Sequence, residues 1–365
     1  MDILPFLMLP AAFVLMFLGV QVAFAMMITA VLFGMITFGD KVVYQFIEKI
    51  DDLSSNFVFA AVPLFVFMGA MLEKSGIADR LFEAIHIWTR RLPGGLALAT
   101  VMMCIIFAAS SGVIGATESV VGLLTIPVML RYGYNKGLIS GTICAGGSLG
   151  TIIPPSVVVI VMGPLADLSV GDLMYGMVFP GLLMGGLYLA YILVLCIFSP
   201  SMGPRIPPDP NDPTFARKLW ITSTNLIPPV FMIFAVLGSI LLGWASPTEA
   251  AAIGALCSVL LTVLYRQFNW RGLFDALVKT VTVTAMIMAV LLAGTLFTGV
   301  FIGGGGINTA NTLIQDMNLS PWMLLSMMMF VIFLSGFFLD WISIVLIFIP
   351  IFTPLVKAAG FDPIW

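Results

Sequence analysis

Residues 108–118 carry small and hydroxyl side chains inside an otherwise apolar run, Ala-Ala-Ser-Ser-Gly-Val-Ile-Gly-Ala-Thr-Glu. Glycine lets the backbone leave a helix, and the carbonyls and hydroxyls released in this way are oxygen ligands that suit Na⁺. The alternative is that the small residues only let helices pack closely. The predicted Na⁺ ligands are Ser110, Ser111 and Gly112, and the predicted substrate contacts are Ser111, Thr117 and Glu118.

A second unusual stretch covers residues 145–156, Ala-Gly-Gly-Ser-Leu-Gly-Thr-Ile-Ile-Pro-Pro-Ser. Two adjacent prolines break a helix and leave backbone carbonyls without donors. A helix that starts beyond them would present N–H groups to an anion. A simple kink is the alternative. The predicted Na⁺ ligands are Gly147, Ser148 and Gly150, and the predicted substrate contacts are Pro154, Pro155 and Ser156.

Two acidic residues, Glu118 and Asp340, lie beside apolar segments. Charge inside a bilayer is costly, which makes each acid a functional candidate. Acids also stabilise helix N-termini, and that interpretation stays open for both. We predict Asp340 as a substrate contact, with Ser335 and Gly336 as Na⁺ ligands. The acid Glu249 has a structural interpretation, because the sequence 246–249, Ser-Pro-Thr-Glu, predicts a helix capping box.

Enzymatic chemistry has no support in the sequence. The chain lacks G-x-S-x-G, H-E-x-x-H and phosphate-loop motifs, its single histidine is His86, and its four cysteines form no C-x-x-C. We therefore predict no catalytic residue and no cofactor other than Na⁺ as the coupling ion. The net charge of −3 also argues against nucleic acid as a partner.

The elements that must position these residues are membrane helices. Of the 365 residues, 61% are hydrophobic and 9% are charged, whereas soluble domains carry about 25% charged residues. Uncharged runs such as 3–39, 137–166 and 280–315 are apolar on all sides, which favours helices over barrel strands. A span needs about 20 apolar residues, and this length rule predicts about 9–12 membrane segments, with the lipid bilayer as solvent.

A proline-rich segment, 200–218, divides the chain and should be an extended linker. The first membrane repeat, 1–199, is predicted to hold a hairpin near 104–130 and a broken helix near 145–156. The second repeat, 219–365, is predicted to hold a hairpin near 330–356.

The repeat prediction depends on matched spacing. Each half contains Ser-Gly, then an acid, then Ile-Pro, and the distance from Gly112 to Pro127 is 15 positions against 14 from Gly336 to Pro350. Short, Gly- or Pro-interrupted segments at matching places in two halves indicate a transporter site. They suit re-entrant hairpins and broken helices, and the fold class is therefore an all-α polytopic membrane protein with two inverted repeats. Chance similarity between two apolar stretches is the alternative.

The ordered motifs resemble the DctM-like large permease subunit of tripartite ATP-independent periplasmic (TRAP) transporters. The similar segments are 62–69 with 75–78, 94–97, 111–117, 133–134, 149–156, 246–250, 336–340 and 360–363. The resemblance implies an elevator-type transporter in the bacterial cell inner membrane, which imports organic acids on a Na⁺ gradient. It also implies two partners, a small membrane subunit (DctQ-like) and a periplasmic substrate-binding protein (DctP-like).

Two departures from the family pattern affect these expectations. Residues 113 and 114 are Val and Ile where many members have serine, so any hydroxyl role there is lost. The first repeat continues 72 residues beyond Pro127, whereas the second continues 15 beyond Pro350, where the family has another Pro-Pro segment. We therefore expect the second repeat to be truncated. A carrier of the same superfamily that needs no binding protein is the main alternative, and a channel is a further one.

Overall fold

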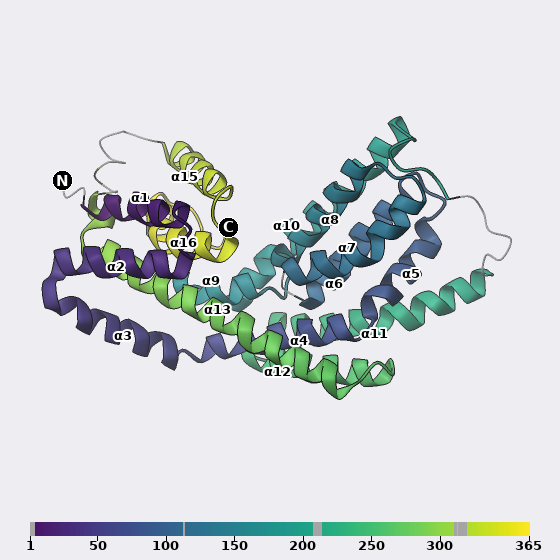
Figure 1. The fold of residues 1–365 in the computed structure, drawn as a ribbon, viewed down its shortest axis with the longest axis horizontal. Coiled ribbons are helices and arrows are strands. Elements are labelled where there is room, and N and C mark those ends of the chain that lie inside the picture. The colour runs from purple at the N-terminus through teal and green to yellow at the C-terminus, as the bar shows by residue number, and fades with distance from the viewer. Residues whose placement is uncertain (1–3, 112–113, 207–213, 310–311, 313–319) are drawn as a thin grey trace. The chain divides into compact units, whose positions relative to one another are not determined.

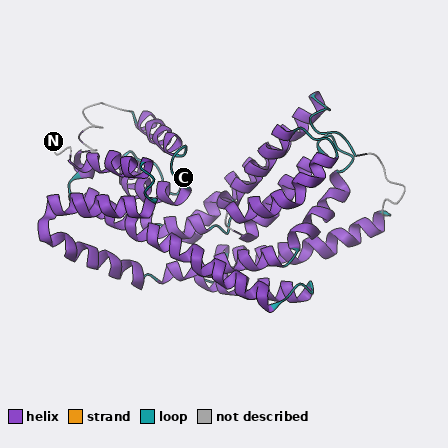
Figure 2. Ribbon diagram, in the orientation of Figure 1, coloured by secondary structure: helices purple, strands orange, loops and turns teal. Residues whose placement is uncertain are grey.

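The computed structural model describes residues 4–111, 114–206, 214–309, 312 and 320–365, without the side chains of residues 110–116. Every regular element in these ranges is a helix, as Figure 2 shows. The predicted all-α fold class is confirmed for this part of the chain.

Seven helical segments in the described ranges are long and apolar enough to cross a membrane, so the chain is a multi-pass membrane protein. An eighth crossing results if two helices bent by 44° against each other form one span. The predicted number was higher because three apolar helices have only 10–17 residues, short of the about 20 that a span needs. The seven segments are Val22–Ser55, Phe57–Lys74, Val170–Phe198, Phe215–Leu241, Pro247–Leu264, Trp270–Gly303 and Trp341–Ala358.

The helices form two compact units, each of which combines segments that are distant in sequence (Figure 1). Unit 1 comprises Met1–Phe57, Val161–Ser169 and Val283–Trp365, and unit 2 comprises Val58–Ile160 and Val170–Thr282. Both units therefore contain residues from before and after the proline-rich segment.

The helices of unit 1 pack around a core of large apolar side chains. Its core contains Met8, Met26, Phe297, Phe301 and Ile347. Its elements are α1 (Leu4–Phe17), α2 (Val22–Phe38), the 3-10 turn η1 (Gly39–Lys41), α3 (Val42–Ser55), the C-terminal part of α13 (Trp270–Gly303), α15 (Pro321–Ser335) and α16 (Trp341–Ala358).

Unit 2 holds the first group of predicted site residues. Helix α8 packs against both α6 and α7, α10 packs against α6 and α8, and α4 packs along α12. Its elements are η2 (Phe57–Ala60), α4 (Ala61–Lys74), α5 (Ile77–Thr89), α6 (Gly95–Ser111), α7 (Ile114–Arg131), α8 (Lys136–Ile152), α10 (Val170–Phe198), α11 (Phe215–Leu241), α12 (Pro247–Leu264) and the first part of α13. Helix α9 (Val157–Ala166) is divided between the units.

Large apolar side chains also face outward, as lipid-facing helices require. Phe179, Phe198 and Phe231 are each at least 69% exposed, although they lie in helices of membrane length. Such side chains would be a liability in water, but hydrocarbon is their natural surrounding. The outward apolar surface therefore agrees with the composition.

Candidate functional site

The side chain of Glu118 lies against the backbone of α8 at Gly147, one of two adjacent glycines in that helix. A Cβ added to Gly147 would be 2.1 Å from Cγ and 2.7 Å from Oε1 of Glu118. At the neighbouring Gly146, an added Cβ would be 2.5 Å from Sγ of Cys104 on α6. The two glycines thus let side chains of α6 and α7 approach the α8 backbone closely.

Glu118 is not placed at the start of its helix. Helix α7 is an 18-residue helix that begins at Ile114, so the acid lies one turn inside it. Thr117, the residue before it, is buried. Helix α7 also keeps Pro127 inside it, as a membrane helix can when neighbouring helices satisfy the freed backbone groups.

Helices α8 and α9 are separated by a break that contains the two predicted prolines. Helix α8 ends at Ile152, α9 begins at Val157, and their axes differ by 44°. Ser156 joins the two ends, since its Oγ donates to the Thr151 carbonyl at 2.8 Å and accepts from the Val158 N–H at 3.3 Å. Pro154, Pro155 and Ser156 are all buried.

The two prolines of this break deprive two carbonyl oxygens of α8 of their helical donors. In a continuous helix, residues 154 and 155 would donate to the carbonyls of Gly150 and Thr151, but proline has no N–H. Ser156 replaces the donor at Thr151, and the Ile153 N–H goes to the Leu149 carbonyl at 2.9 Å. No donor to the Gly150 carbonyl is found among the described residues. The hydroxyl of Ser148 is engaged within α8, where it donates to the Ala145 carbonyl at 2.8 Å.

Part of the first predicted site lies outside the described residues. Gly112 belongs to that part, as do the side chains of Ser110 and Ser111, although both serines complete α6. Their predicted role as Na⁺ ligands, and that of Ser111 as a substrate contact, stays a prediction.

The second group of predicted residues lies in unit 1, at the connection between α15 and α16. Ser335 is the last residue of α15, and its hydroxyl donates to the Val331 carbonyl at 2.8 Å. Gly336 follows as the C-cap and donates its N–H to the Ile332 carbonyl. Asp340 is the N-cap of α16, where its carboxylate accepts the Ile342 N–H at 3.3 Å and the Ser343 hydroxyl. The carboxylate is thus engaged at a helix start, and the predicted substrate contact stays a prediction.

Helix α16 contains two prolines and is nevertheless continuous. It has 18 residues, meets the length needed to cross a membrane, and keeps Pro350 and Pro354 inside it. A neighbouring helix makes this possible, because the Leu346 carbonyl, which Pro350 deprives of its donor, accepts from Oγ1 of Thr298 on α13 at 3.3 Å.

The same contact shows two residues that the sequence analysis missed. A Cβ added to Gly294 would be 2.7 Å from Cβ of Leu346, so this glycine brings α13 against α16 at the place where Thr298 donates. The available signal was Leu346, four positions before Pro350. Its carbonyl cannot accept from a proline, so the sequence implied a donor from another helix.

Clustered ionisable ligands do not explain the site. Within the described ranges, no group of three or more His, Cys, Asp or Glu residues could hold a metal ion. His86 lies in α5, stacked on Phe82, and its pKa is lowered from 6.5 by burial and then by the positive charge of Arg90. The predicted Na⁺ ligands, which are backbone and hydroxyl oxygens, stay a prediction.

Comparison with known proteins places the chain in a family. The sequence profile of the tripartite ATP-independent periplasmic transporter, DctM component, matches residues 9–365. The "C4-dicarboxylate TRAP transporter large permease protein DctM" of Pseudomonas aeruginosa is 31% identical over 318 residues, which are 87% of this chain and 73% of that protein. The "Isethionate TRAP transporter permease protein DctMQ" of Oleidesulfovibrio alaskensis is 30% identical over 311 residues, which are 85% of this chain and 48% of that protein.

A solved structure has a similar fold. The Alcanivorax borkumensis YdaH transporter superposes with a TM-score of 0.62 at 16% sequence identity, over 89% of this chain and 75% of that one. The predicted resemblance is confirmed: this chain belongs to the DctM family, the large permease component of TRAP transporters.

Proposed function

We propose that this chain is the large membrane subunit of a Na⁺-coupled transporter that imports organic acids across the bacterial inner membrane. A periplasmic binding protein (DctP-like) delivers the acid, and a small membrane subunit (DctQ-like) completes the complex. Family membership supports the transport role, and relatives named for C4-dicarboxylate and isethionate support an anionic organic substrate.

The Gly150 carbonyl is the observation that supports an ion site in this chain. This carbonyl oxygen lacks a hydrogen-bond donor among the described residues. It lies one helical turn from Gly147, which contacts the Glu118 side chain. An unpaired carbonyl at membrane depth is costly unless water, protein or an ion satisfies it. Na⁺ does so directly, because it prefers carbonyl and hydroxyl oxygens.

In the proposed transport cycle, the ion and the acid bind beside the helix breaks, and the elements that carry these breaks move together against a fixed scaffold. The α8–α9 break contributes the Gly150 carbonyl and, beyond Ser156, the N-terminus of α9, which favours an anion. Ion and acid then share one site, and this coupling makes uptake depend on Na⁺.

Uptake measured in vesicles tests this proposal. We would reconstitute the chain with its two partner subunits and follow labelled organic acids with and without an inward Na⁺ gradient. Uptake should require the gradient and the binding protein. Uptake without Na⁺ would refute the coupling, and uptake without the binding protein would favour the independent carrier considered from the sequence.

A proline substitution tests the ion site itself. Pro154→Ala supplies an N–H and removes the ring that stops α8, whose C-cap Ile153 is extended. If α8 then extends by one turn, this N–H satisfies the Gly150 carbonyl, and the Na⁺ concentration for half-maximal uptake should rise about tenfold. Pro228→Ala is the matched control, because Pro228 lies inside α11, which packs against α5 and α12. Equal Na⁺ dependence in both variants would remove Gly150 from the proposed site.

A further inference from the structure

Three connections of unit 2 are held together at one end of its helices. The Gly94 N–H donates to the Gly203 carbonyl at 3.0 Å, and the Asn135 N–H donates to the Met202 carbonyl at 3.0 Å. The Tyr134 hydroxyl also accepts the Leu96 N–H at 3.1 Å. The α5–α6 and α7–α8 connections are therefore fastened to the segment that follows α10.

This end of unit 2 is strongly cationic. The described parts of the three connections, residues 90–94, 131–136 and 199–206, contain no Asp or Glu, and the next acids, Asp209 and Asp212, follow outside the described residues. Elsewhere in unit 2, acids and bases of different helices form ion pairs, as in Lys279 with Glu73 at 2.5 Å and Lys74 with Asp275 at 3.7 Å. The cations of this end are Arg90, Arg91, Arg131, Lys136 and Arg205.

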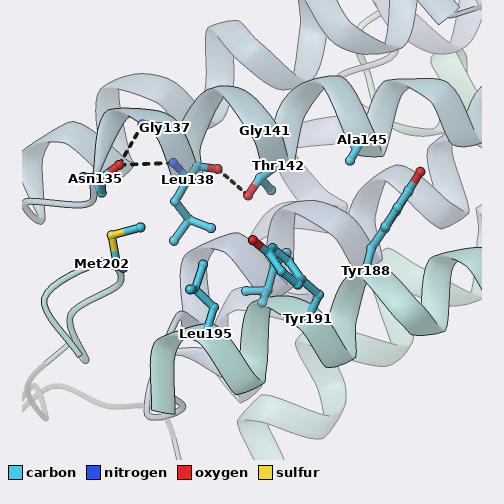
Figure 3. Close-up of a pocket in the computed structure, with 11 residues that line it drawn as sticks. Asn135, Gly137, Leu138, Gly141, Thr142, Ala145, Tyr188, Tyr191, Leu195 and Met202 are labelled. Atoms are coloured by element: carbon cyan, nitrogen blue, oxygen red, sulfur yellow. Dashed lines mark hydrogen bonds between the residues drawn. The ribbon is translucent and has the colours of Figure 1, made fainter. Parts of the chain in front are cut away.

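A groove of about 390 Å³ begins at this cationic end and runs between α8 and α10 (Figure 3). Asn135 and Met202 line it at the end, and Lys136 lies between the lining residues Asn135 and Gly137. Its volume is within the range of about 300–1,000 Å³ that ligand pockets occupy.

The groove is lined mostly by apolar surface, and two tyrosines line its α10 side. Figure 3 shows the rings of Tyr188 and Tyr191 rising from α10 toward α8. On the α8 side, Gly141 leaves open space, since an added Cβ would meet no atom within 4 Å. Apolar walls and tyrosine hydroxyls together suit a chain with an apolar body and polar ester groups.

We propose that this groove binds one anionic glycerophospholipid. An acyl chain lies along Gly141 and Tyr188, and the phosphate lies among Lys136, Arg131 and Arg205. The Asn135 side chain supports the phosphate, because its Oδ1 caps α8 while its amide N–H groups remain available as donors. Basic pockets between membrane helices on the cytoplasmic side are typical sites of anionic headgroups.

Charge favours a lipid over a helix of another chain as the occupant. A partner helix that used the small residues of α8 would need a flat approach, but Tyr188 and Tyr191 stand over that face. The positive-inside rule also places a cluster of Arg and Lys connections at the cytoplasmic leaflet, where anionic lipids gather.

Two variants and a control test the site by the lipid retained on the purified protein. Native mass spectrometry in mild detergent should show one bound phosphatidylglycerol or cardiolipin on the wild type. Gly141→Phe fills the groove and should lower the retained lipid about tenfold. Gly186→Phe is the control, because an added Cβ there also meets nothing within 4 Å and Gly186 does not line the groove. Equal retention in both variants would overturn the proposal.

The headgroup is tested separately, with a variant that does not change the groove. Lys136 is exposed, so Lys136→Glu should fold normally and bind added dioleoylphosphatidylglycerol about tenfold more weakly. The wild type should prefer this lipid to dioleoylphosphatidylcholine, and no preference would overturn the anionic assignment. A photocrosslinker at Ala145 should label lipid, whereas labelling of a polypeptide would show that a helix covers the groove.

Discussion

Replacing Thr298 with valine tests the structural argument for α16 most directly. The valine has the same shape but cannot donate to the Leu346 carbonyl, which has no backbone donor because residue 350 is proline. Hydrogen bonds between membrane helices contribute about 0.6 kcal/mol on average and up to about 1.7 kcal/mol, and an unpaired buried acceptor costs about 1–3 kcal/mol. The 3.3 Å distance is longer than the common O–H···O distance of about 2.7–2.8 Å. We therefore expect a loss near the lower end, about 1 kcal/mol, or a fivefold change in the folded-to-unfolded ratio.

Equilibrium unfolding in mixed micelles measures this loss, with Thr295→Val as the control. Thr295 also lies in α13, but its hydroxyl donates at 2.9 Å to Leu292 within the same helix. The Leu292 carbonyl keeps its backbone donor in that variant, so the change in stability should be small. If both variants unfolded alike, the assignment of Thr298 as the replacement donor would be wrong.

Three further predictions concern unit 2. Gly147→Ala should lower the free energy of unfolding by about 1–3 kcal/mol, because the added methyl overpacks against Glu118. In a double-mutant cycle, Glu118→Ala in the same chain should remove most of that loss, and additive effects would contradict the contact. Tyr134→Phe should lower the free energy of unfolding by about 1–2 kcal/mol, since the Leu96 N–H loses its acceptor. Burial raises the pKa of Tyr134 to about 12, so wild-type stability should fall between pH 10 and 12, and the variant should lack this fall. Because the pKa of His86 is lowered in the folded chain, the unfolded chain takes up this proton at a higher pH than the folded chain as the pH falls. Stability should therefore decrease below pH 6.5, and His86→Gln should flatten that dependence in a pH series of unfolding curves.

The helices and one of their breaks could be predicted because their causes are local. Long apolar runs predict membrane helices, and Ser246 with Glu249 forms the predicted capping box, with the Ser246 N–H donating to Oε2 at 2.8 Å. Pro154 and Pro155 interrupt the chain between α8 and α9, where proline must end the hydrogen-bond ladder. These features depend on residues within a few positions of one another.

Features that depend on distant residues could not be predicted in this way. The length of α16 depends on Thr298, which lies 52 positions before Pro350 and supplies a donor from another helix. The contact of Glu118 with Gly147 requires knowing that α7 and α8 pack together. The composition of the two units is likewise set by packing between distant segments, which no local pattern reveals.

The contacts of the two acids separate roles that the sequence had treated as equivalent. Asp340 has its carboxylate engaged by the Ile342 N–H and the Ser343 hydroxyl, so α16 itself accounts for its charge. Glu118 has no such helix start to cap, and no hydrogen bond or ion pair to it is found among the described residues. A carboxylate in that situation repels an anionic substrate and attracts a cation. Since the Gly150 carbonyl, one turn along α8 from Gly147, also lacks a donor, both groups are better matched to Na⁺ than to an organic acid. The predicted substrate contact of Glu118 stays a prediction. We propose that Glu118 belongs to the ion site, and that the N-terminus of α9 is the part of the break that favours the organic acid.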